Sequence, residues 1–385
     1  MPTTLTVRIL GAGISGLASA ILLAADGHRV ELIDERFEAP AVGTSLGLFG
    51  PAQTALARLG LLDQVRAMSA APDAGTLRSA DGRVLAAVPA GKALLISRSD
   101  LVRALLEALP ESVERRRRRV EEVRPLRDGA DLLVGADGAH SLVRRSGWPG
   151  QGRARSHGVT VLRGTAAIAP PEISETWGRG WLFRITPLAG GGTNWFACLP
   201  EHRTGSRDED LAHLRRSLGG RRDVIDEVLA AASTEQTLVH GLHTAPAVWP
   251  VRQNVVLVGD AAHAMAPNLG HGANTALQDA ESLALALRHA QSRASQGPSP
   301  QQGPSPQEGS LQSPSAVVAP ALRRYSAARA LPGQGWRLGS EAMLRVAMSS
   351  RGAPLRDRVL HCTTGRLAER RSSSARHAER RGVPR

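Results

Sequence analysis

The sequence predicts an α/β fold in which a parallel sheet with its helices is combined with an antiparallel sheet and a C-terminal helical region. Three observations predict it. A strand–turn–helix–strand unit occupies residues 7–34, and short β-like segments alternate with Pro and Gly over 158–200. A buried segment at 255–258 then leads through a Gly-rich loop into a long helical pattern. The chain of 385 residues, 42% of them hydrophobic, is long enough for two domains.

The first unit carries a glycine-rich turn. A short buried strand is expected at 7–10, a helix of small residues at 17–25 and a second strand at 30–34. Between strand and helix, Gly11, Gly13 and Gly16 satisfy the pattern G-x-G-x-x-G, with Ser15 inside it. Gly11 allows the tight turn, Gly13 lets the backbone approach a pyrophosphate, and Gly16 allows the helix to pack on the strand. The helix N-terminus then faces the phosphates.

An acidic residue follows at the distance that a ribose requires. Asp34 lies 23 residues after Gly11, at the end of the second strand, where a carboxylate accepts hydrogen bonds from the ribose hydroxyls. Glu35 is the competing candidate, and Arg36 follows directly. Strand, turn, helix and acidic residue together indicate dinucleotide binding, but this motif does not separate FAD from NAD.

The remaining elements are expected in the following order. A helix within 94–109 has Ser97 or Ser99 as its cap, and a strand at 131–134 ends at Gly135. Antiparallel strands are expected at 159–162, 181–185 and 193–199, a helical region at 206–232, and a buried strand at 255–258. Further helices are expected at 272–289 and 318–330.

These elements suggest a discontinuous domain organisation. Residues 1–157 and 251–290 are expected to form the dinucleotide-binding domain, with an α+β substrate domain over 158–250 between them. Residues 291–317, rich in Ser, Gln, Pro and Gly, predict a linker, followed by C-terminal helices at 318–365. The last segment, 366–385, has seven arginines and two glutamates and is expected to be a disordered tail.

Composition excludes several classes of protein. The net charge of +13 comes almost entirely from arginine, because Lys92 is the only lysine, and part of it lies in the tail. A basic nucleic-acid-binding protein is therefore the weaker alternative, and a single tyrosine offers no base-stacking platform. No apolar segment is long enough for a membrane span, and no secretory signal is recognised. Two distant cysteines fit a cytoplasmic protein without disulfides or a metal site.

Three further segments resemble a known family. They are 96–101 (Ile-Ser-Arg-Ser-Asp-Leu), 135–144 (Gly-Ala-Asp-Gly-Ala-His-Ser-Leu-Val-Arg) and 258–274, which begins Val-Gly-Asp-Ala-Ala-His and is followed by Asp279-Ala280. With the glycine turn, their order and spacing resemble the class A flavoprotein monooxygenases, the para-hydroxybenzoate hydroxylase family, and loosely its salicylate- and urate-hydroxylating branch. The resemblance implies a Rossmann-type FAD-binding domain and covers residues 7 to about 290.

The resemblance adds cofactor-binding candidates to Gly11, Gly13, Ser15, Gly16, Asp34, Glu35 and Arg36. They are Arg98, Asp137, Asp260, Pro267, Gly270, Gly272, Ala273 and Asn274. Asp260 would accept hydrogen bonds from the ribityl chain, and the helix starting near Gly272 would face the N1–C2=O edge of the flavin. Taken alone, Asp137-Gly138 reads as a turn and Asp260 as a cap.

The mechanism implied by the resemblance needs few side chains. NADH or NADPH reduces the flavin, O2 adds to it, and the resulting hydroperoxide transfers one oxygen to an aromatic or electron-rich small molecule. No catalytic residue is assigned. His263 is considered as a base, but no carboxylate partner is visible nearby in the sequence, so a structural role is favoured for it and for His271. A reductase or a degraded, non-oxygenating relative is the alternative function.

Substrate contacts are expected from the central antiparallel sheet. The candidates are Arg184, Asn194, Trp195 and Phe196, with Phe183 beside them. In a strand, Asn194 and Phe196 face opposite to Trp195, so only one set lines the pocket. A small-molecule partner and a monomer or homodimer are expected.

One departure from the family pattern concerns the segment before Gly135. Gly135 follows Arg98 by only 37 positions, and one or two strands between Arg124 and Asp131 are expected to be missing. The arginines at 115–119 also interrupt the pattern. A shortened meander would leave a sheet edge unpaired and weaken flavin retention.

Overall fold

A six-stranded sheet forms the centre of the first part of the molecule. The computed structural model describes residues 3–42, 44–72, 74–89, 91–169, 173–295 and 314–365. The strand order is β14-β15-β8-β1-β2-β7, parallel except for β14. The strands are β1 (Thr6–Leu10), β2 (Arg29–Asp34), β7 (Glu114–Arg117), β8 (Leu132–Gly135), β14 (Val251–Arg252) and β15 (Val255–Leu257).

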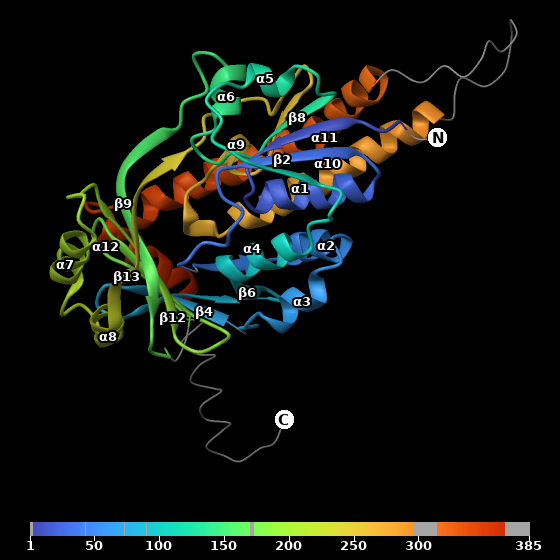
Figure 1. The fold of residues 1–385 in the computed structure, drawn as a ribbon. Helices are drawn as coiled ribbons and strands as arrows, with labels where there is room; N and C mark the ends of the chain where they lie inside the picture. Colours follow the sequence, from blue (N-terminus) through green and yellow to red (C-terminus); the bar gives the residue numbers. More distant parts are fainter. Residues whose placement is uncertain are drawn as a thin grey trace, which may run out of the picture.

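Helices pack on both faces of this sheet (Figure 1). The largest core lies under α1 (Ile14–Ala25), α2 (Gly50–Arg58), α4 (Arg98–Glu107) and α10 (Gly272–Ser295), with α3 (Leu62–Ala67) beside them. A smaller core on the other face includes residues of α5 (Arg124–Arg127), α6 (Leu142–Gly147) and α9 (Asp260–His263). Apolar residues at both faces are what a parallel sheet requires.

A seven-stranded sheet forms the second part, in the order β13-β9-β12-β11-β10-β4-β5. Its strands are β4 (Ala74–Ser79), β5 (Val84–Pro89), β9 (Arg155–Ala166), β10 (Ile173–Trp177), β11 (Leu182–Pro187), β12 (Thr193–Pro200) and β13 (Ala232–Thr244). Helices α7 (Arg207–Leu218) and α8 (Asp223–Ala231) bury one face of it. The other face lies toward the first part of the molecule, where the long strands β9 and β13 connect the two (Figure 1).

Several boundaries differ from those expected. Strands β4 and β5 come from the segment assigned to the dinucleotide-binding domain, yet they extend the seven-stranded sheet, where β4 pairs in parallel with β10 and all other neighbours are antiparallel. The first of the strands expected for the substrate domain begins at Arg155 rather than at 158. The glycines at 219 and 220 divide the helical region 206–232 into two helices. Helix α1 begins at Ile14, inside the glycine motif, rather than at residue 17.

The arginines before Gly135 do not interrupt the fold. Residues 114–117 form the edge strand β7, which pairs in parallel with β2, and its side chains are all exposed. The short helix α5 occupies the place where strands were expected to be missing. Charged side chains on an edge strand discourage pairing with another chain, so the arginines protect this edge.

The C-terminal region is more helical than the sequence suggested. Helix α10 continues to Ser295, so 291–295 are not linker, and α11 (Pro314–Ala347) begins before 318 and runs well past 330. Pro332 and the glycines at 333, 335 and 339 lower helix propensity there, but an added Cβ at Gly333 would lie 2.6 Å from His263. Tertiary packing therefore outweighs local propensity. Helix α12 (Ala353–Leu360) and a π-helical turn (His361–Gly365) follow, while 296–313 and the tail at 366–385 lie outside the described residues.

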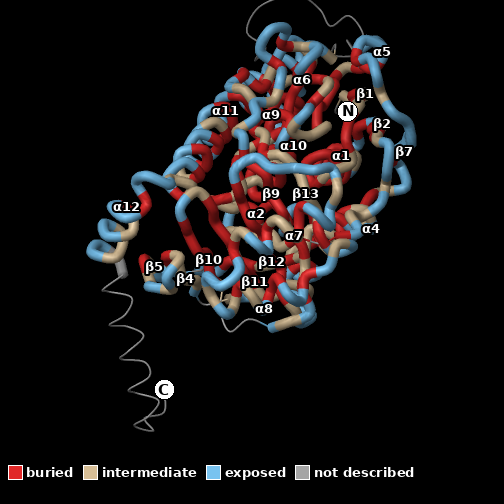
Figure 2. Tube along the Cα trace, turned by 90° about the vertical axis from the view of Figure 1, so that its left-hand side faces the viewer, coloured by how far each residue is buried: buried red, intermediate tan, exposed pale blue. Residues whose placement is uncertain are grey.

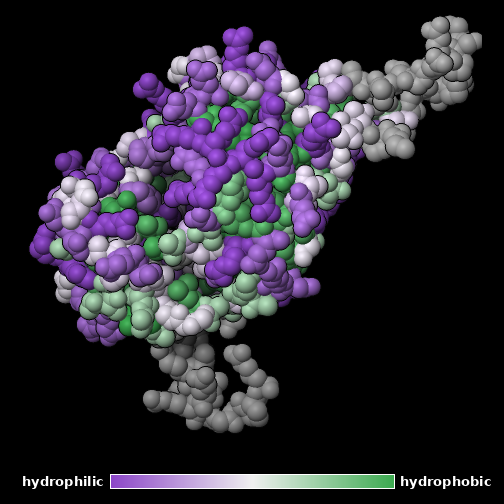
Figure 3. All heavy atoms as spheres, viewed as in Figure 1, coloured by the Kyte–Doolittle hydropathy of each residue, from purple (hydrophilic) through white to green (hydrophobic). Residues whose placement is uncertain are grey.

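The expected α/β fold with parallel and antiparallel sheets is confirmed. Figure 2 shows buried residues concentrated along the strands and exposed residues on the outer helices. Figure 3 shows hydrophilic side chains over most of one face, with hydrophobic residues visible in the hollows between them. Within the described residues, no helix is long and apolar enough to cross a membrane.

Candidate active site

The carboxyl ends of four neighbouring strands meet at one edge of the six-stranded sheet. Strands β15, β8, β1 and β2 are parallel and adjacent. Gly11 follows β1, Asp34 ends β2, Asp137 follows β8 and Asp260 opens α9 after β15. Ligands of open α/β sheets bind in the crevice beyond such strand ends. Segments far apart in the sequence thus contribute to one site.

The glycine turn is built for close approach. Gly11 has φ +109°, and an added Cβ would lie 2.3 Å from the carbonyl oxygen of Ala136. An added Cβ at Gly16 would lie 1.8 Å from the carbonyl oxygen of Gly11. At Gly13, by contrast, no atom would lie within 4 Å. Helix α1 starts there without a side-chain cap, so its first amides face open space and fit a pyrophosphate.

Asp34, rather than Glu35, faces this turn. One Asp34 carboxylate oxygen accepts a hydrogen bond from the Ala12 amide at 2.6 Å, and the other accepts one from the Arg36 amide at 2.9 Å. Glu35 is exposed and lies 3.6 Å from Arg119. The Arg36 side chain is also exposed. Asp34 is thus held where a ribose bound beside the turn would lie.

Asp137 caps a helix. Its carboxylate accepts hydrogen bonds from the Ser141 hydroxyl (2.5 Å) and from the amides of Leu142 (2.6 Å) and Val143 (3.1 Å). Burial raises the pKa of Asp137, and these hydrogen bonds oppose the rise. Its three contacts all lie at the start of α6, so the carboxylate organises the Gly138 turn rather than pointing at a dinucleotide.

Arg144 joins the second and third motifs. Its guanidinium is fully buried and donates to the carbonyl oxygens of Gly152 at 2.9 Å and Ala261 at 2.7 Å. The motif contains this arginine, but no role was assigned to it from the sequence, because its acceptors are backbone carbonyls that only the fold brings together.

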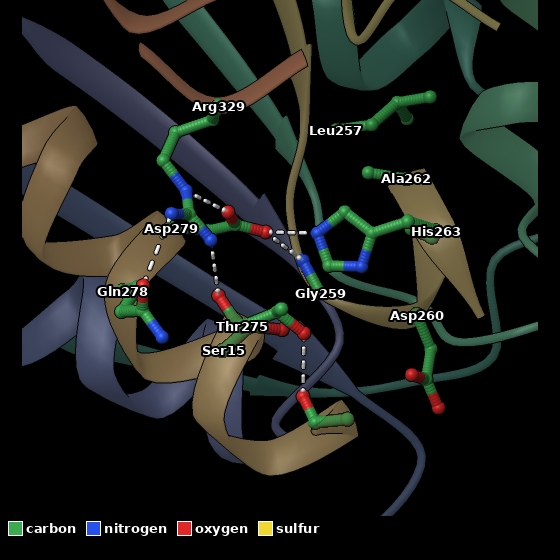
Figure 4. A network of polar contacts seen from close by, with 12 residues as sticks. Ser15, Leu257, Gly259, Asp260, Ala262, His263, Thr275, Gln278, Asp279 and Arg329 are labelled. Carbon is green, nitrogen blue, oxygen red and sulfur yellow. Dashed lines mark hydrogen bonds and ion pairs between the residues drawn. The ribbon is translucent and has the colours of Figure 1, made fainter. Parts of the chain in front are cut away.

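Asp260 points away from the buried side chains around it (Figure 4). The residue is exposed, and no protein hydrogen bond to its carboxylate is found among the described residues. The preceding Gly259 has φ +58°, and an added Cβ would lie 2.6 Å from the Ser15 hydroxyl oxygen. The first and third motifs are therefore in contact, and the Asp260 carboxylate is available to a ligand.

The loop after α9 presents bare backbone to the same crevice. Pro267 starts a 3-10 turn (Pro267–Leu269), and Gly270 follows with φ +65°. An added Cβ at Gly270 or Gly272 would meet no atom within 4 Å, so there is room for a flat ring against the backbone. Ala273 is buried in α10 just behind.

Asn274 and Arg98 both form hydrogen bonds with the backbone of residues 44–49. The Asn274 side chain accepts a hydrogen bond from the Phe49 amide (2.8 Å) and donates to the carbonyl oxygen of Gly47 (2.7 Å). This amide is thus committed to the backbone near β3 (Ser45–Leu48), which pairs with β6 (Leu94–Ser97). Arg98, whose amide donates to the Thr44 carbonyl oxygen at 2.7 Å, begins α4 beside it. Ser97, not Ser99, caps that helix.

A buried charged network lies behind the loop (Figure 4). The Asp279 carboxylate accepts from His263 Nε2 (2.6 Å), Arg329 Nε (2.7 Å) and the Gly259 amide (2.8 Å). Burial alone would lower the pKa of His263, but Asp279 outweighs it and the pKa is raised. Burial would raise the pKa of Asp279, but His263 and Arg329 outweigh it and the pKa is lowered.

This network shows that His263 has a carboxylate partner, contrary to the expectation from the sequence, and it supports a structural role for His263. His263 does have a carboxylate partner, 16 positions away in the sequence, which local spacing could not reveal. With 3% exposure it is out of reach of a substrate, so its role is structural, as favoured. His271 is stacked between Phe49 and Trp336, with ring centroids at 4.9 and 3.5 Å, and is likewise a packing residue.

The substrate candidates divide between the two faces of the seven-stranded sheet. Trp195 is fully buried, stacks on Phe183 at 5.9 Å and packs under α7 and α8, so it does not face the crevice. Asn194 faces the other way and accepts a hydrogen bond from the Ser45 amide at 2.9 Å. Phe196 lies under the Arg184 guanidinium at 5.3 Å.

Arg184 contacts the loop between α9 and α10, residues 264–271, which is the segment expected to lie against the flavin and is called the flavin loop. Its Nη2 lies 2.5 Å from the Glu175 carboxylate and donates to the Asn268 carbonyl oxygen at 3.1 Å. A separate cavity of about 320 Å³ is lined by residues of β6, α4, β9 and the loop 188–191, together with Ala41 and Met68. One face of the sheet thus meets the crevice at which the motifs converge.

The fold and this site are those expected of an FAD-binding oxidoreductase. Open space lies at the uncapped N-terminus of α1, the Asp34 carboxylate is held beside it, and the loop after α9 presents unobstructed glycine backbone. Comparison with known proteins agrees. The family described as "FAD binding domain" matches residues 4–297.

Two curated relatives are similar over most of their length. 3-Amino-4-hydroxybenzoate 2-monooxygenase of Streptomyces cremeus is 34% identical over 313 residues, 72% of this chain and 77% of the relative. 2-Heptyl-3-hydroxy-4(1H)-quinolone synthase of Pseudomonas aeruginosa is 34% identical over 316 residues, 73% and 80% of the two chains. The chain therefore belongs to the FAD binding domain family, and it is an FAD-dependent monooxygenase of the class A type.

Solved structures share the fold. Klebsiella pneumoniae HpxO, complexed with FAD and uric acid, has a TM-score of 0.76 at 22% identity and covers 94% of both chains. P. aeruginosa PqsL, in complex with 2-aminobenzoylacetate, has a TM-score of 0.73 at 23% identity, covering 94% of this chain and all of that one.

Proposed function

We propose that the protein uses NADH or NADPH and O2 to insert one oxygen atom into an aromatic or electron-rich small molecule, by hydroxylation or epoxidation. The observation that carries this is the crevice itself, in which the loop with the open glycine backbone meets the face of the seven-stranded sheet that carries Arg184. FAD, when bound, supplies the electron transfer and the activation of oxygen.

The protein's own residues bind and orient FAD. The pyrophosphate occupies the open space at Gly13, where the first amides of α1 donate hydrogen bonds to it. The Asp34 carboxylate accepts hydrogen bonds from the ribose hydroxyls. Asp260 accepts hydrogen bonds from the ribityl chain, and Gly270 and Gly272 lie against the ring. The N-terminus of α10 stabilises negative charge at the neighbouring edge of the ring. Asn274 acts indirectly, by fixing the distance between this loop and β3.

Relatives support oxygenation over a flavin reductase. Besides the monooxygenase and the quinolone synthase, zeaxanthin epoxidase of Solanum lycopersicum is 34% identical over 178 residues, which are 44% of this chain and 26% of the epoxidase. The names of these relatives refer to a hydroxybenzoate, a quinolone and zeaxanthin, all small organic molecules. We infer small-molecule partners rather than nucleic acid, and a monomer or homodimer in the cytoplasm, which fits two unpaired cysteines.

The test is oxygen incorporation. Purified protein loaded with FAD is given NADH or NADPH, 18O2 and a library of aromatic compounds, and the products are analysed by mass spectrometry. We expect stimulated NAD(P)H oxidation and one 18O atom in the product of a responding compound. NAD(P)H oxidation stimulated by compounds that never gain 18O would establish a reductase instead. Size-exclusion chromatography decides the oligomeric state.

A further inference from the structure

Exposed apolar side chains are concentrated on the last two helices. Among the residues that the structure describes, six of the eight large hydrophobic side chains that are exposed belong to α11 or α12. One of the six, Trp336, is stacked on His271 and so packs against the flavin loop. Scattered apolar residues on a surface need no explanation, whereas a group of them marks an interaction site. The other five are called the C-terminal face: Leu331, Leu338, Val346, Leu355 and Val359.

The α11 part of this face is a continuous stripe along the helix. Leu331 is 76% exposed, and Leu338 and Val346 follow at intervals of seven and eight residues. Such intervals place all three side chains on one side of a helix. The positions between them on that side are small and exposed, namely Gly335 and Ala342. The opposite side of α11 is buried, so the stripe faces away from the rest of the molecule.

Helix α12 extends the face beyond the end of α11. Leu355 is 69% exposed, and Val359 lies one helical turn after it. Between them the buried Arg356 donates hydrogen bonds to the carbonyl oxygens of Ala347 at 2.6 Å and Val346 at 3.2 Å. This arginine ties α12 to the end of α11 where the stripe finishes, so the two parts adjoin. Figure 2 shows α12 exposed at the left-hand edge of the molecule, reached directly from α11.

The surroundings of the face are strongly cationic. Residues 321–365 contain eight arginines but only two acidic residues, and both acids are engaged. Glu341 is buried and pairs with Arg337 and Arg345, and Asp357 pairs with Arg356. Most of the chain's net charge of +13 lies after residue 320, because the segment 366–385 adds seven arginines and two glutamates.

Three exposed arginines lie directly beside the apolar side chains. Arg345 is next to Val346 in the chain, and its side chain is 69% exposed although it contacts Glu341. Arg351 and Arg358 are exposed and lie four positions before and three positions after Leu355. An apolar face bordered by arginine side chains is the pattern of a helix that lies in the interface of a membrane.

We propose that the C-terminal face binds the surface of a membrane that contains anionic phospholipids. The five apolar side chains enter the headgroup region, and Arg345, Arg351 and Arg358 pair with lipid phosphates. Charge selects this partner. A second copy of the chain would bring the same arginines together, and like charges across an interface are unfavourable. A nucleic acid would neutralise the arginines but leave the leucines in water.

The experiment measures vesicle binding by the full-length, FAD-loaded protein. The protein is sedimented with phosphatidylcholine vesicles that either contain or lack phosphatidylglycerol, at low and at high salt. We expect binding to the anionic vesicles, much weaker binding to the neutral ones, and a loss of affinity at high salt. The double variant Arg351→Gln and Arg358→Gln should bind anionic vesicles less tightly.

Apolar insertion is tested with charged substitutions of exposed leucines. Leu338→Glu and Leu355→Glu should each lower the affinity for anionic vesicles by about tenfold or more, because each removes one inserting side chain and adds an anion. Leu285→Glu is the matched control, since Leu285 is an exposed leucine of α10 outside the C-terminal face, and it carries the same charge change. Flavin content and melting temperature should stay at the wild-type level in all three variants.

Three results would overturn the proposal. The first is a wild-type protein that stays in the supernatant with anionic vesicles. The second is equal vesicle binding by Leu338→Glu, Leu355→Glu and Leu285→Glu, which would mean that charge alone attracts the protein. The third is a dimer in the absence of vesicles that only the first two variants dissociate, which would assign the face to a second copy. Vesicle binding needs neither NAD(P)H nor O2, so its outcome is independent of the proposed function.

Discussion

His263 Nε2 lies 2.6 Å from the Asp279 carboxylate, and this contact joins α9, which opens with Asp260, to α10, which starts beside the flavin loop. Arg329 of α11 binds the other carboxylate oxygen at 2.7 Å. The same carboxylate holds the Gly259 amide, directly before Asp260. The buried Asp279 therefore fixes the backbone that carries Asp260, whose carboxylate is available to a ligand.

Replacing Asp279 is expected to loosen this arrangement. Asp279→Asn leaves the Arg329 guanidinium buried without a counter-charge, and breaking such a pair costs roughly 3–5 kcal/mol. We expect a lower melting temperature and weaker FAD retention, measured by thermal unfolding and by flavin content after gel filtration. Glu281→Gln on the same helix is the control, because Glu281 pairs with the half-exposed Arg58 and contributes little. Equal losses in both variants would contradict a special role for Asp279.

A substitution at Gly13 should affect FAD binding without affecting the stability of the fold. The residue has an extended backbone (φ −79°, ψ −174°) that valine adopts readily, and an added Cβ meets no protein atom within 4 Å. Gly13→Val is therefore expected to keep the stability of the FAD-free protein while abolishing FAD binding, since the side chain fills the space of the pyrophosphate. Gly147→Ala, equally unobstructed but in α6, should keep its flavin. Normal flavin content in Gly13→Val would refute the placement of the dinucleotide.

The glycine turn could be predicted from local sequence patterns, whereas other parts of the site depend on contacts between residues far apart in the sequence. The turn at Gly11 to Gly16 could be predicted because strand, glycines, helix and Asp34 are neighbours in sequence. The contact between His263 and Asp279 could not, because it depends on how α10 packs against the loop before it. Strand alternation established that Trp195 and Phe196 face opposite ways. Only the position of α7 and α8 decided which of the two lies away from the crevice.

The acid limit of stability is expected to depend on His240. Burial, then the charge of Arg163, lowers the pKa of His240 to about 4 from the ordinary 6.5. The folded protein thus holds this histidine neutral while the unfolded chain protonates it at higher pH. Its contribution is fully present above pH 6.5 and is lost as the pH falls toward 4. Thermal unfolding across this window should show a smaller decline in His240→Gln than in wild type. An identical decline would mean that other groups set the acid limit.

Asp260 is expected to act on the cofactor alone. Its carboxylate is exposed, so Asp260→Ala removes no protein contact that the structure describes, and thermal unfolding of the FAD-free protein should be unchanged. FAD affinity should fall by about tenfold to a hundredfold, equivalent to the loss of one charge-assisted hydrogen bond of roughly 1.5–3 kcal/mol. Fluorescence titration with FAD measures it. Wild-type affinity in this variant would show that the ribityl chain lies elsewhere.

Substitutions of Trp195 and Phe196, which are neighbours in β12, should have different effects: the first on stability and the second on KM. Trp195 is fully buried in the core under α7 and α8, so Trp195→Ala should destabilise the fold by roughly 3–5 kcal/mol. Phe196 lies on the inner face under Arg184, so Phe196→Leu keeps most of the buried apolar volume but removes the flat ring. We expect this variant to retain near wild-type stability and FAD content while KM for a responding aromatic compound rises.

Melting temperature and KM, measured on both variants, separate the two roles. Trp195→Phe serves as a milder control, because it keeps an aromatic ring against Phe183 and should recover much of the lost stability. A Phe196→Leu variant with unchanged KM, or a Trp195→Phe variant that is fully stable but changed in KM, would place the substrate on the opposite face of the sheet.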